Sequence, residues 1–297
     1  RSRRQRQMCI RDRYLKDLDE YRHMYEKSVT DPSSFFLEHA LKELDWFEKP
    51  SVGYSGKITK PTWFRDGVLN ISHNCIDRHA AKNPNKTAII WQGDEKENTK
   101  NISYAQLLIE VSKLANGLKS IGVKKGDRVC IYMPMIPEAA YSMLACMRIG
   151  AIHSVVFGGF SPEAISSRIL DSDCQYVITA DEGIRGGKRV NLKENVDIAL
   201  KNCPNVQKTI VFKYTNANID WVDSRDICYE ELISQMPDVC KPEKMLAEDP
   251  SFILYTSGST GKPKGVMHTT GGYLLGATMS FKYIFGFSPE DIYWCTA

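Results

Sequence analysis

One stretch of the sequence combines several residue types that bind phosphate groups. Residues 255–266 read YTSGSTGKPKGV, in which a short apolar strand leads into a loop with three Gly, two Ser, two Thr and two Lys. The glycines let backbone amides turn toward one point, the hydroxyls add hydrogen-bond donors, and the lysines supply positive charge. The loop is therefore suited to cradling a polyphosphate, and a flexible, solvated surface loop is the alternative interpretation.

The spacing within this loop excludes a Walker A motif. That motif requires G-x-x-x-x-G-K-[ST]. Here Gly258 and Gly261 are only three positions apart, and Lys262 is followed by Pro263. A different kind of phosphate-binding loop is needed to explain the pattern.

Two further short segments could approach a ligand. Residues 185–188 read RGGK and follow a predicted strand, so that cations and a flexible backbone can meet a phosphate there. Residues 157–159 read FGG and leave room for a ligand close to the backbone. The alternatives are a solvated turn for RGGK and close packing of a strand against a helix for FGG.

The elements that would position these segments alternate between strand and helix along most of the chain. Short connections between them predict a largely parallel sheet with helices on both faces, which is an α/β fold. The predicted strands are 87–91, 128–132, 152–156, 176–180, 209–212 and 251–255. The predicted helices are 103–122, 137–150, 161 onward, 190–200, 229–235 and 270–285.

The two ends of the chain differ from this pattern. Residues 14–81 are aromatic-rich and irregular, with helical patterns only near 36–46 and 69–81, and suggest a lid that packs onto a larger body. At the other end, a strand predicted to begin at Asp291 is cut off at Ala297, which predicts that the sequence is part of a longer protein.

The net positive charge of the chain comes from residues 1–13 (RSRRQRQMCIRDR), which hold six of the 39 Lys and Arg residues. A nucleic-acid-binding arm, a mitochondrial presequence and a disordered tail are three generic interpretations of such a segment. A more specific one is that RRQRQMCIRDR resembles the translation of a transposon-based sequencing adapter, so the segment is excluded here from the fold prediction. Without its six Arg and one Asp, the net charge falls from +3 to −2.

Composition removes several classes of protein. The body of the chain has no net positive field that would indicate nucleic acid or an anionic membrane as a partner, and no apolar run has the length of a membrane span. The nine cysteines show neither zinc-type spacing nor a CxxC pair, which favours reduced thiols and a cytoplasmic location. His153 lies in an apolar strand and is expected to be a hydrogen-bonded core residue, not a base.

The phosphate loop resembles the signature TSG[ST]TGxPKG of the adenylate-forming superfamily at every defined position of residues 256–265. The resemblance implies a nucleotide-binding role and an adenylate-forming large N-terminal domain. It assigns eight residues to ATP: Thr256, Ser257, Gly258, Ser259, Thr260, Gly261, Lys262 and Lys264.

Longer segments resemble the acetyl-CoA synthetase family, including YEKSVTDPSSFF (25–36), LDWFEKP (44–50) and WFRDGVLNISHNCIDRH (63–79). The resemblance implies an N-terminal lid at 14–81 and an incomplete AMP-binding domain at 82–297. A C-terminal domain that carries the adenylation lysine is expected beyond the sequence, so no catalytic residue is assigned. The resemblance also places seven residues beside CoA: Phe157, Gly158, Gly159, Arg185, Gly186, Gly187 and Lys188.

The implied reaction joins a short carboxylate, acetate, to CoA through an acyl-AMP intermediate. ATP and CoA are substrates, Mg²⁺ assists at the phosphates, no resident metal is expected, and the oligomeric state is open. Alternatives are a propionyl-CoA or other short-chain synthetase, a catalytically silent nucleotide-binding protein, and a nucleic-acid-binding protein supported only by residues 1–13.

Overall fold

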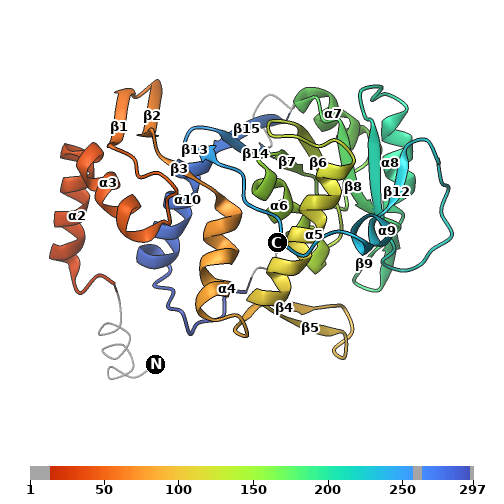
Figure 1. The fold of residues 1–297 in the computed structure, drawn as a ribbon, viewed down its shortest axis with the longest axis horizontal. Helices are drawn as coiled ribbons and strands as arrows, with labels where there is room; N and C mark the ends of the chain where they lie inside the picture. The colour runs from red at the N-terminus through yellow and green to blue at the C-terminus, as the bar shows by residue number, and fades with distance from the viewer. Residues whose placement is uncertain (1–13, 257–262, 295–297) are drawn as a thin grey trace. The chain divides into compact units, whose positions relative to one another are not determined.

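The fold is taken from a computed structural model, which describes residues 14–256 and 263–294. Its contacts divide these residues into two compact units (Figure 1). The first unit consists of 14–69, 246–249 and 270–294, and the second consists of 70–245, 250–256 and 263–269. No helix in the described ranges combines the length and the apolar composition that crossing a lipid bilayer requires.

The first unit joins two early helices and a hairpin to a late helix of the chain. Asp31 ends one helix and caps the next, where its carboxylate accepts a hydrogen bond from the Ser34 amide. Gly53 in the hairpin lies so close to the second helix that a Cβ on it would be 2.0 Å from the Ser33 carbonyl oxygen. The elements are α2 (Leu18–Thr30), α3 (Pro32–Glu43), β1 (Val52–Lys57), β2 (Lys60–Arg65), β3 (Val68–Leu69), α10 (Thr270–Met279) and the π-helix η2 (Ser280–Ile284).

Two elements of the first unit were not predicted from the sequence. Helix α2 buries none of its residues, but Leu18, Tyr21 and Tyr25 follow a helical spacing and Asp17 caps its first turn, so the sequence held signals of this helix that were not used. The β1–β2 hairpin occupies a region that was predicted to be irregular, and Gly56 and Pro61 lie opposite each other in its ladder, next to the last pair. Gly56 has a φ of 91°, which explains the glycine at the turn.

The second unit is built on a seven-stranded sheet in the order β12-β11-β8-β6-β7-β14-β15. All neighbours are parallel except β14 and β15, which are antiparallel. The strands are β6 (Arg128–Tyr132), β7 (Ile152–Val155), β8 (Tyr176–Ala180), β11 (Lys208–Phe212), β12 (Asp226–Cys228), β14 (Pro250–Thr256) and β15 (Lys264–Thr269).

Helices and small hairpins surround this sheet. The helices are α4 (Arg78–Lys82), α5 (Tyr104–Ser120), α6 (Pro137–Ile149), α7 (Pro162–Ser172), α8 (Leu192–Leu200), α9 (Tyr229–Ser234) and the π-helix η1 (His73–Asp77). The hairpins are β4 (Thr87–Gln92) with β5 (Thr99–Ser103), and β9 (Gly183–Arg185) with β10 (Lys188–Val190). The two-residue strand β13 (Met245–Leu246) lies at the junction of the two units along the chain.

Alternate residues of the central strand β6 face two separate cores. Val129 and Ile131 belong to a cluster with α5, α6 and α9, whereas Cys130 and Tyr132 belong to a cluster with α7 and α8. Helices therefore cover both faces of the sheet (Figure 1), and the predicted α/β fold is confirmed.

The local predictions in this unit are mostly confirmed. The bounds of β6 and β8 are those predicted, and α5 begins with the expected capping box between Ser103 and Gln106. Strand β15 was missed, because glycine and proline around it indicate a loop. The strand expected from Asp291 is wrong, since 291–294 form no strand.

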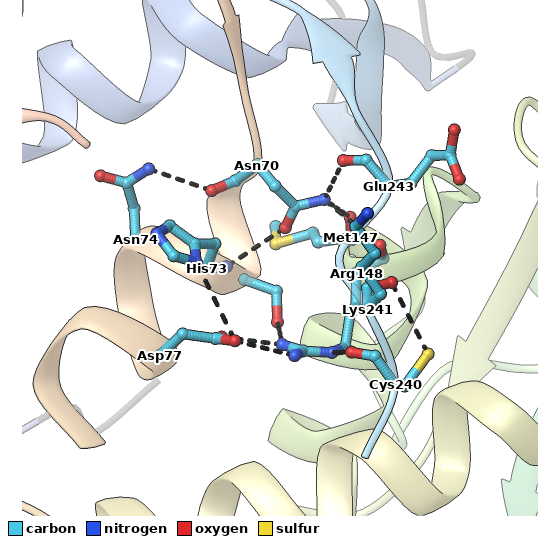
Figure 2. A network of polar contacts seen from close by, with 10 residues as sticks. Asn70, His73, Asn74, Asp77, Met147, Arg148, Cys240, Lys241 and Glu243 are labelled. Carbon is cyan, nitrogen blue, oxygen red and sulfur yellow. Dashed lines mark hydrogen bonds and ion pairs between the residues drawn. The ribbon is translucent and has the colours of Figure 1, made fainter. Parts of the chain in front are cut away.

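A buried arginine ties η1 and α6 together in the second unit (Figure 2). The Arg148 guanidinium donates two hydrogen bonds of 2.8 Å to the Asp77 carboxylate, and its Nε donates to the Cys240 carbonyl at 2.6 Å. Asn70 adds hydrogen bonds to the carbonyls of Met147 and Arg148. Arg148 is 3% exposed, so its guanidinium is almost completely shielded from water.

Candidate functional site

The predicted phosphate loop connects two strands that pair with each other. Thr256 ends β14 and Lys264 begins β15, and these two residues lie opposite each other in the antiparallel register. Opposite residues of such a pair share a face of the sheet, so the Thr256 hydroxyl and the Lys264 ammonium are on the same side. Both residues are exposed.

Six of the eight predicted ATP residues fall outside the described residues. They are Ser257, Gly258, Ser259, Thr260, Gly261 and Lys262. The structure therefore describes the two strand ends that hold the loop, and the roles assigned to the loop residues stay predictions.

Three predicted segments follow strands that end at the same edge of the sheet. The loop follows β14, Phe157–Gly159 follows β7, and the RGGK segment follows β8. These strands are all parallel, so their carboxyl ends lie on the same side. Ligands of open α/β sheets bind at this edge, beside the point where consecutive connections run in opposite directions. Here β7 and β8 lie on opposite sides of β6.

The RGGK segment forms a tight hairpin. Gly186 and Gly187 have φ of 56° and 72°, as a two-residue turn with positive φ at both positions requires. Arg185 and Lys188 flank the turn and lie directly opposite each other, so the two cations share a face. A Cβ on either glycine would meet nothing within 4 Å, so there is open space above the turn.

The structure brings the RGGK and FGG segments together. The Arg185 guanidinium lies 4.8 Å from the centre of the Phe157 ring, in a cation–π contact. Phe157 is 41% exposed, so the pair lies at the surface where a ligand could reach it. The two segments that hold the seven residues predicted beside CoA thus contact each other at the surface.

Tyr132, at the end of β6, supports the FGG segment and was missed in the sequence. Its hydroxyl lies 3.1 Å from the Gly158 carbonyl and 2.9 Å from the Phe160 carbonyl, and it accepts a hydrogen bond from Asn195 at 3.2 Å. Burial raises the pKa of Tyr132. An apolar strand that ends in tyrosine gives no signal that distinguishes this role from ordinary core packing.

Asp181, directly after β8, is a second residue that sequence reasoning missed. Its buried carboxylate accepts hydrogen bonds from the backbone amides of Tyr214, Thr215 and Ala217. It therefore joins the loop after β11 to the start of the RGGK hairpin. An acidic residue at the carboxyl end of a predicted strand was a signal that could have identified it.

Asp94 makes a further contact with the hairpin. One of its carboxylate oxygens accepts a hydrogen bond of 3.1 Å from the Gly187 amide. The β4–β5 hairpin, which carries Asp94, thus holds the tip of the RGGK hairpin.

The two histidines near β14 are stacked. His153 and His268 lie on either side of Phe252, with ring centres 5.4 Å and 4.6 Å away. His153 is buried, as predicted. Its Nδ1 has no hydrogen-bond partner among the described residues, so the predicted hydrogen bonding of this side chain is not confirmed at that atom. His268 lies in β15, next to the end of that strand.

Comparison with known proteins identifies the family to which the chain belongs. The family model described as "AMP-binding enzyme" matches residues 76–297, and the one described as "Acetyl-coenzyme A synthetase N-terminus" matches residues 21–75. The chain therefore belongs to the AMP-binding enzymes, as the phosphate-loop signature predicted.

Two curated relatives match almost the whole chain. The chain is 58% identical over 284 residues to "Acetyl-coenzyme A synthetase" of Gamma-proteobacterium EBAC31A08, covering 96% of this chain and 44% of the relative. It is 56% identical over 292 residues to "Acetyl-coenzyme A synthetase 2" of Pseudomonas aeruginosa, covering 97% of this chain and 45% of the relative. The chain thus spans a little less than half the length of these curated relatives.

A solved structure shares the fold. It is described as acetoacetyl-CoA synthetase from Streptomyces lividans and superposes with a TM-score of 0.80. The sequence identity is 23%, and the match covers 86% of this chain and 39% of that chain. At this identity the likeness supports the fold alone.

Proposed function

We propose that the complete protein containing this chain activates acetate with ATP and transfers the acetyl group to CoA. In the first half-reaction, a carboxylate oxygen attacks the α-phosphorus of Mg²⁺-bound ATP and releases pyrophosphate. In the second, the CoA thiol attacks the acyl carbon and releases AMP. The observation that carries the proposal is the TSGSTGKPKG loop at the carboxyl end of β14, in a chain 58% identical to a protein named acetyl-coenzyme A synthetase.

The ATP half rests on the strand ends around the loop. Thr256 and Lys264 present a hydroxyl and an ammonium on one face, and both are exposed where the loop begins and ends. Backbone amides of the intervening glycines and the Lys262 ammonium would neutralise the phosphates. This chain's contribution is positioning and charge neutralisation, so none of its side chains needs to act as a nucleophile.

The CoA half rests on the RGGK hairpin. Arg185 and Lys188 lie side by side with open space above Gly186 and Gly187, which suits a phosphate group of CoA. Phe157 and the two glycines that follow it lie next to Arg185 and would form the surface on which the CoA nucleotide rests.

The proposal also covers the domain organisation, the partners and the location of the protein. We infer a lid at 14–81, an incomplete AMP-binding domain at 82–297, and a further C-terminal domain with the adenylation lysine. Acetate, ATP and CoA are the expected partners, with no nucleic acid and no membrane, and the cytoplasm is the expected location. The eight loop residues and seven hairpin and FGG residues keep their predicted roles.

The test of the proposal is acid-dependent exchange of labelled pyrophosphate into ATP by the complete protein. Acetate should support exchange, because acyl-AMP formation is reversible in the absence of CoA. Propionate and a sample without acid are run beside it. Exchange that is faster with propionate would favour the propionyl-CoA synthetase alternative, and ATP binding without any acid-dependent exchange would favour the silent nucleotide-binding alternative.

A matched pair of variants connects the exchange to the loop. Lys262→Ala removes a loop charge and should reduce exchange at least tenfold, since a charge-assisted phosphate contact is lost. Lys201→Ala removes a charge from the exposed residue after α8, at the end of that helix away from the hairpin, and should leave exchange unchanged. Equal effects of the two substitutions would contradict the assignment of the loop.

A further inference from the structure

Tyr255 holds both ends of the phosphate loop. It precedes Thr256 in β14, and its ring covers Gly265 of β15, where a Cβ would lie 3.2 Å from the Tyr255 ring carbons. The Tyr255 hydroxyl donates a hydrogen bond of 2.6 Å to the Asp171 carboxylate in α7. Burial, together with this hydrogen bond, raises the pKa of Tyr255. The strand ends around the loop are thereby attached to α7.

Arg168, one turn earlier in α7, lies against the Tyr255 ring. Its guanidinium carbon is 5.4 Å from the centre of that ring and 4.7 Å from the centre of the Phe160 ring. Arg168 is 8% exposed and donates a hydrogen bond of 2.7 Å to the Ala164 carbonyl. No ion pair joins it to a carboxylate within residues 14–256 and 263–294. Its buried charge therefore faces two aromatic rings and one backbone carbonyl.

The contacts of Arg168 continue to the RGGK hairpin. Phe160 and Phe157 meet edge to face with ring centres 5.7 Å apart, and Arg185 lies over the Phe157 ring at 4.8 Å. Cations and aromatic rings thus form an unbroken series from β9 to β14, in the order Arg185, Phe157, Phe160, Arg168 and Tyr255. We name these five residues the cation–aromatic series.

We propose that Arg168 is a positioning residue that fixes the strand ends at Thr256 and Lys264 relative to the FGG segment, so that the ATP and CoA surfaces share one support. The inference rests on the proposed function, which assigns ATP to the loop and CoA to the FGG and RGGK segments. Arg168 itself touches neither predicted site. Its planar cation packs between two rings, and a neutral side chain of similar length would leave both rings without that contact.

The test measures dissociation constants for ATP and for CoA by calorimetry on the complete protein, a readout independent of turnover. Arg168→Met keeps much of the side-chain volume but loses the charge, and should weaken both constants about tenfold. Arg168→Lys keeps the charge but loses the planar face, and should recover part of each loss. The matched control is Arg128→Met, because Arg128 pairs with Asp173, the C-cap of α7, and lies outside the series.

The two variants should affect ligand binding differently. Arg168→Met should weaken both constants, whereas Arg128→Met should lower the melting temperature with both constants unchanged. Constants within twofold of the wild type for Arg168→Met, or a change in only one of them, would overturn the inference. If Arg168→Met fails to fold, Phe160→Leu takes its place, and a loss of about threefold in both constants is expected. Absence of acetate-dependent exchange in the wild type would reject the proposed function without affecting this comparison.

Discussion

His153 is buried and Asp77 is half-buried, and the two residues respond to pH for different reasons. Burial lowers the pKa of His153 to about 3, since its ring is enclosed in the sheet beside Phe252. Burial alone would raise the pKa of Asp77, but hydrogen bonds and charge from Arg148 and His73 lower it to about 2. The first residue stays neutral in the folded protein, and the second stays ionised.

Because of His153, folding should become less favourable as the pH falls below about 6.5. The unfolded histidine takes up a proton near its ordinary pKa of about 6.5, whereas the folded one does so only near 3, so stability is complete above 6.5 and declines below it. His153→Phe keeps a stacked ring and removes this titration. Between pH 7.5 and 5.5, the wild type should lose about 1.4 kcal/mol of unfolding free energy relative to the variant. Urea titrations at both pH values measure this, and an unchanged difference between the two proteins would contradict it.

At the scale of elements, the Arg148–Asp77 pair joins η1 to α6 (Figure 2). Asp77→Asn would leave a 3% exposed guanidinium without its counter-charge and should cost about 3–5 kcal/mol of unfolding free energy. The control is Arg128→Met, which breaks a pair whose partner Asp173 has a half-exposed side chain and should cost about 1 kcal/mol. Urea unfolding measures the loss of unfolding free energy in both variants. Similar losses would contradict the view that burial makes the Arg148–Asp77 pair contribute more to stability than the exposed pair.

The same pair predicts behaviour in acid. The folded pKa of Asp77 is lowered, so its contribution is complete above the unfolded value of about 4 and is lost as the pH falls toward 2. Asp77→Asn should therefore flatten the stability curve between pH 4 and 2. A curve in that range that matches the wild type would argue against an ionised Asp77 in the folded protein.

The RGGK hairpin should affect the use of CoA and not the formation of acyl-AMP. In the complete protein, Arg185→Ala should raise the KM for CoA about tenfold or more and leave acetate-dependent pyrophosphate exchange unchanged, because a charge-assisted contact to the second substrate is lost. Arg189→Ala is the control on the same hairpin, since Arg189 pairs with Glu182 and lies outside the RGGK turn. Equal damage to exchange and to thioester formation by Arg185→Ala would indicate a structural role for Arg185.

Elements with a strong local pattern could be predicted from the sequence, and those defined by tertiary pairing could not. The capping box of α5 and the apolar strands β6 and β8 carry their own signals. Strand β15 forms only because its backbone pairs with β14, despite the glycine and proline at its start. Likewise, the site residues in glycine-rich motifs were found, whereas Tyr132 and Asp181 act through backbone groups that only the fold brings near them.

At the scale of the whole molecule, the chain spans 44–45% of the length of two curated relatives that it matches. The proposed adenylation lysine belongs to a domain outside the sequence. Residues 14–297 expressed alone should therefore show no acetate-dependent pyrophosphate exchange, because misplacing the reacting groups by about 1 Å already costs about a hundredfold in rate. Exchange above a no-protein control, and abolished by Lys262→Ala, would contradict this expectation.

The central claim is that acetate is activated as acetyl-AMP, and the most direct measurement follows the acetate oxygen. The complete protein is supplied with ATP, CoA and acetate labelled with ¹⁸O at both oxygens, and the nucleotide products are analysed by mass spectrometry. Attack of the carboxylate on the α-phosphorus predicts one ¹⁸O in AMP for each acetyl-CoA formed, with unlabelled pyrophosphate. Unlabelled AMP, or ADP together with labelled inorganic phosphate, would contradict the account.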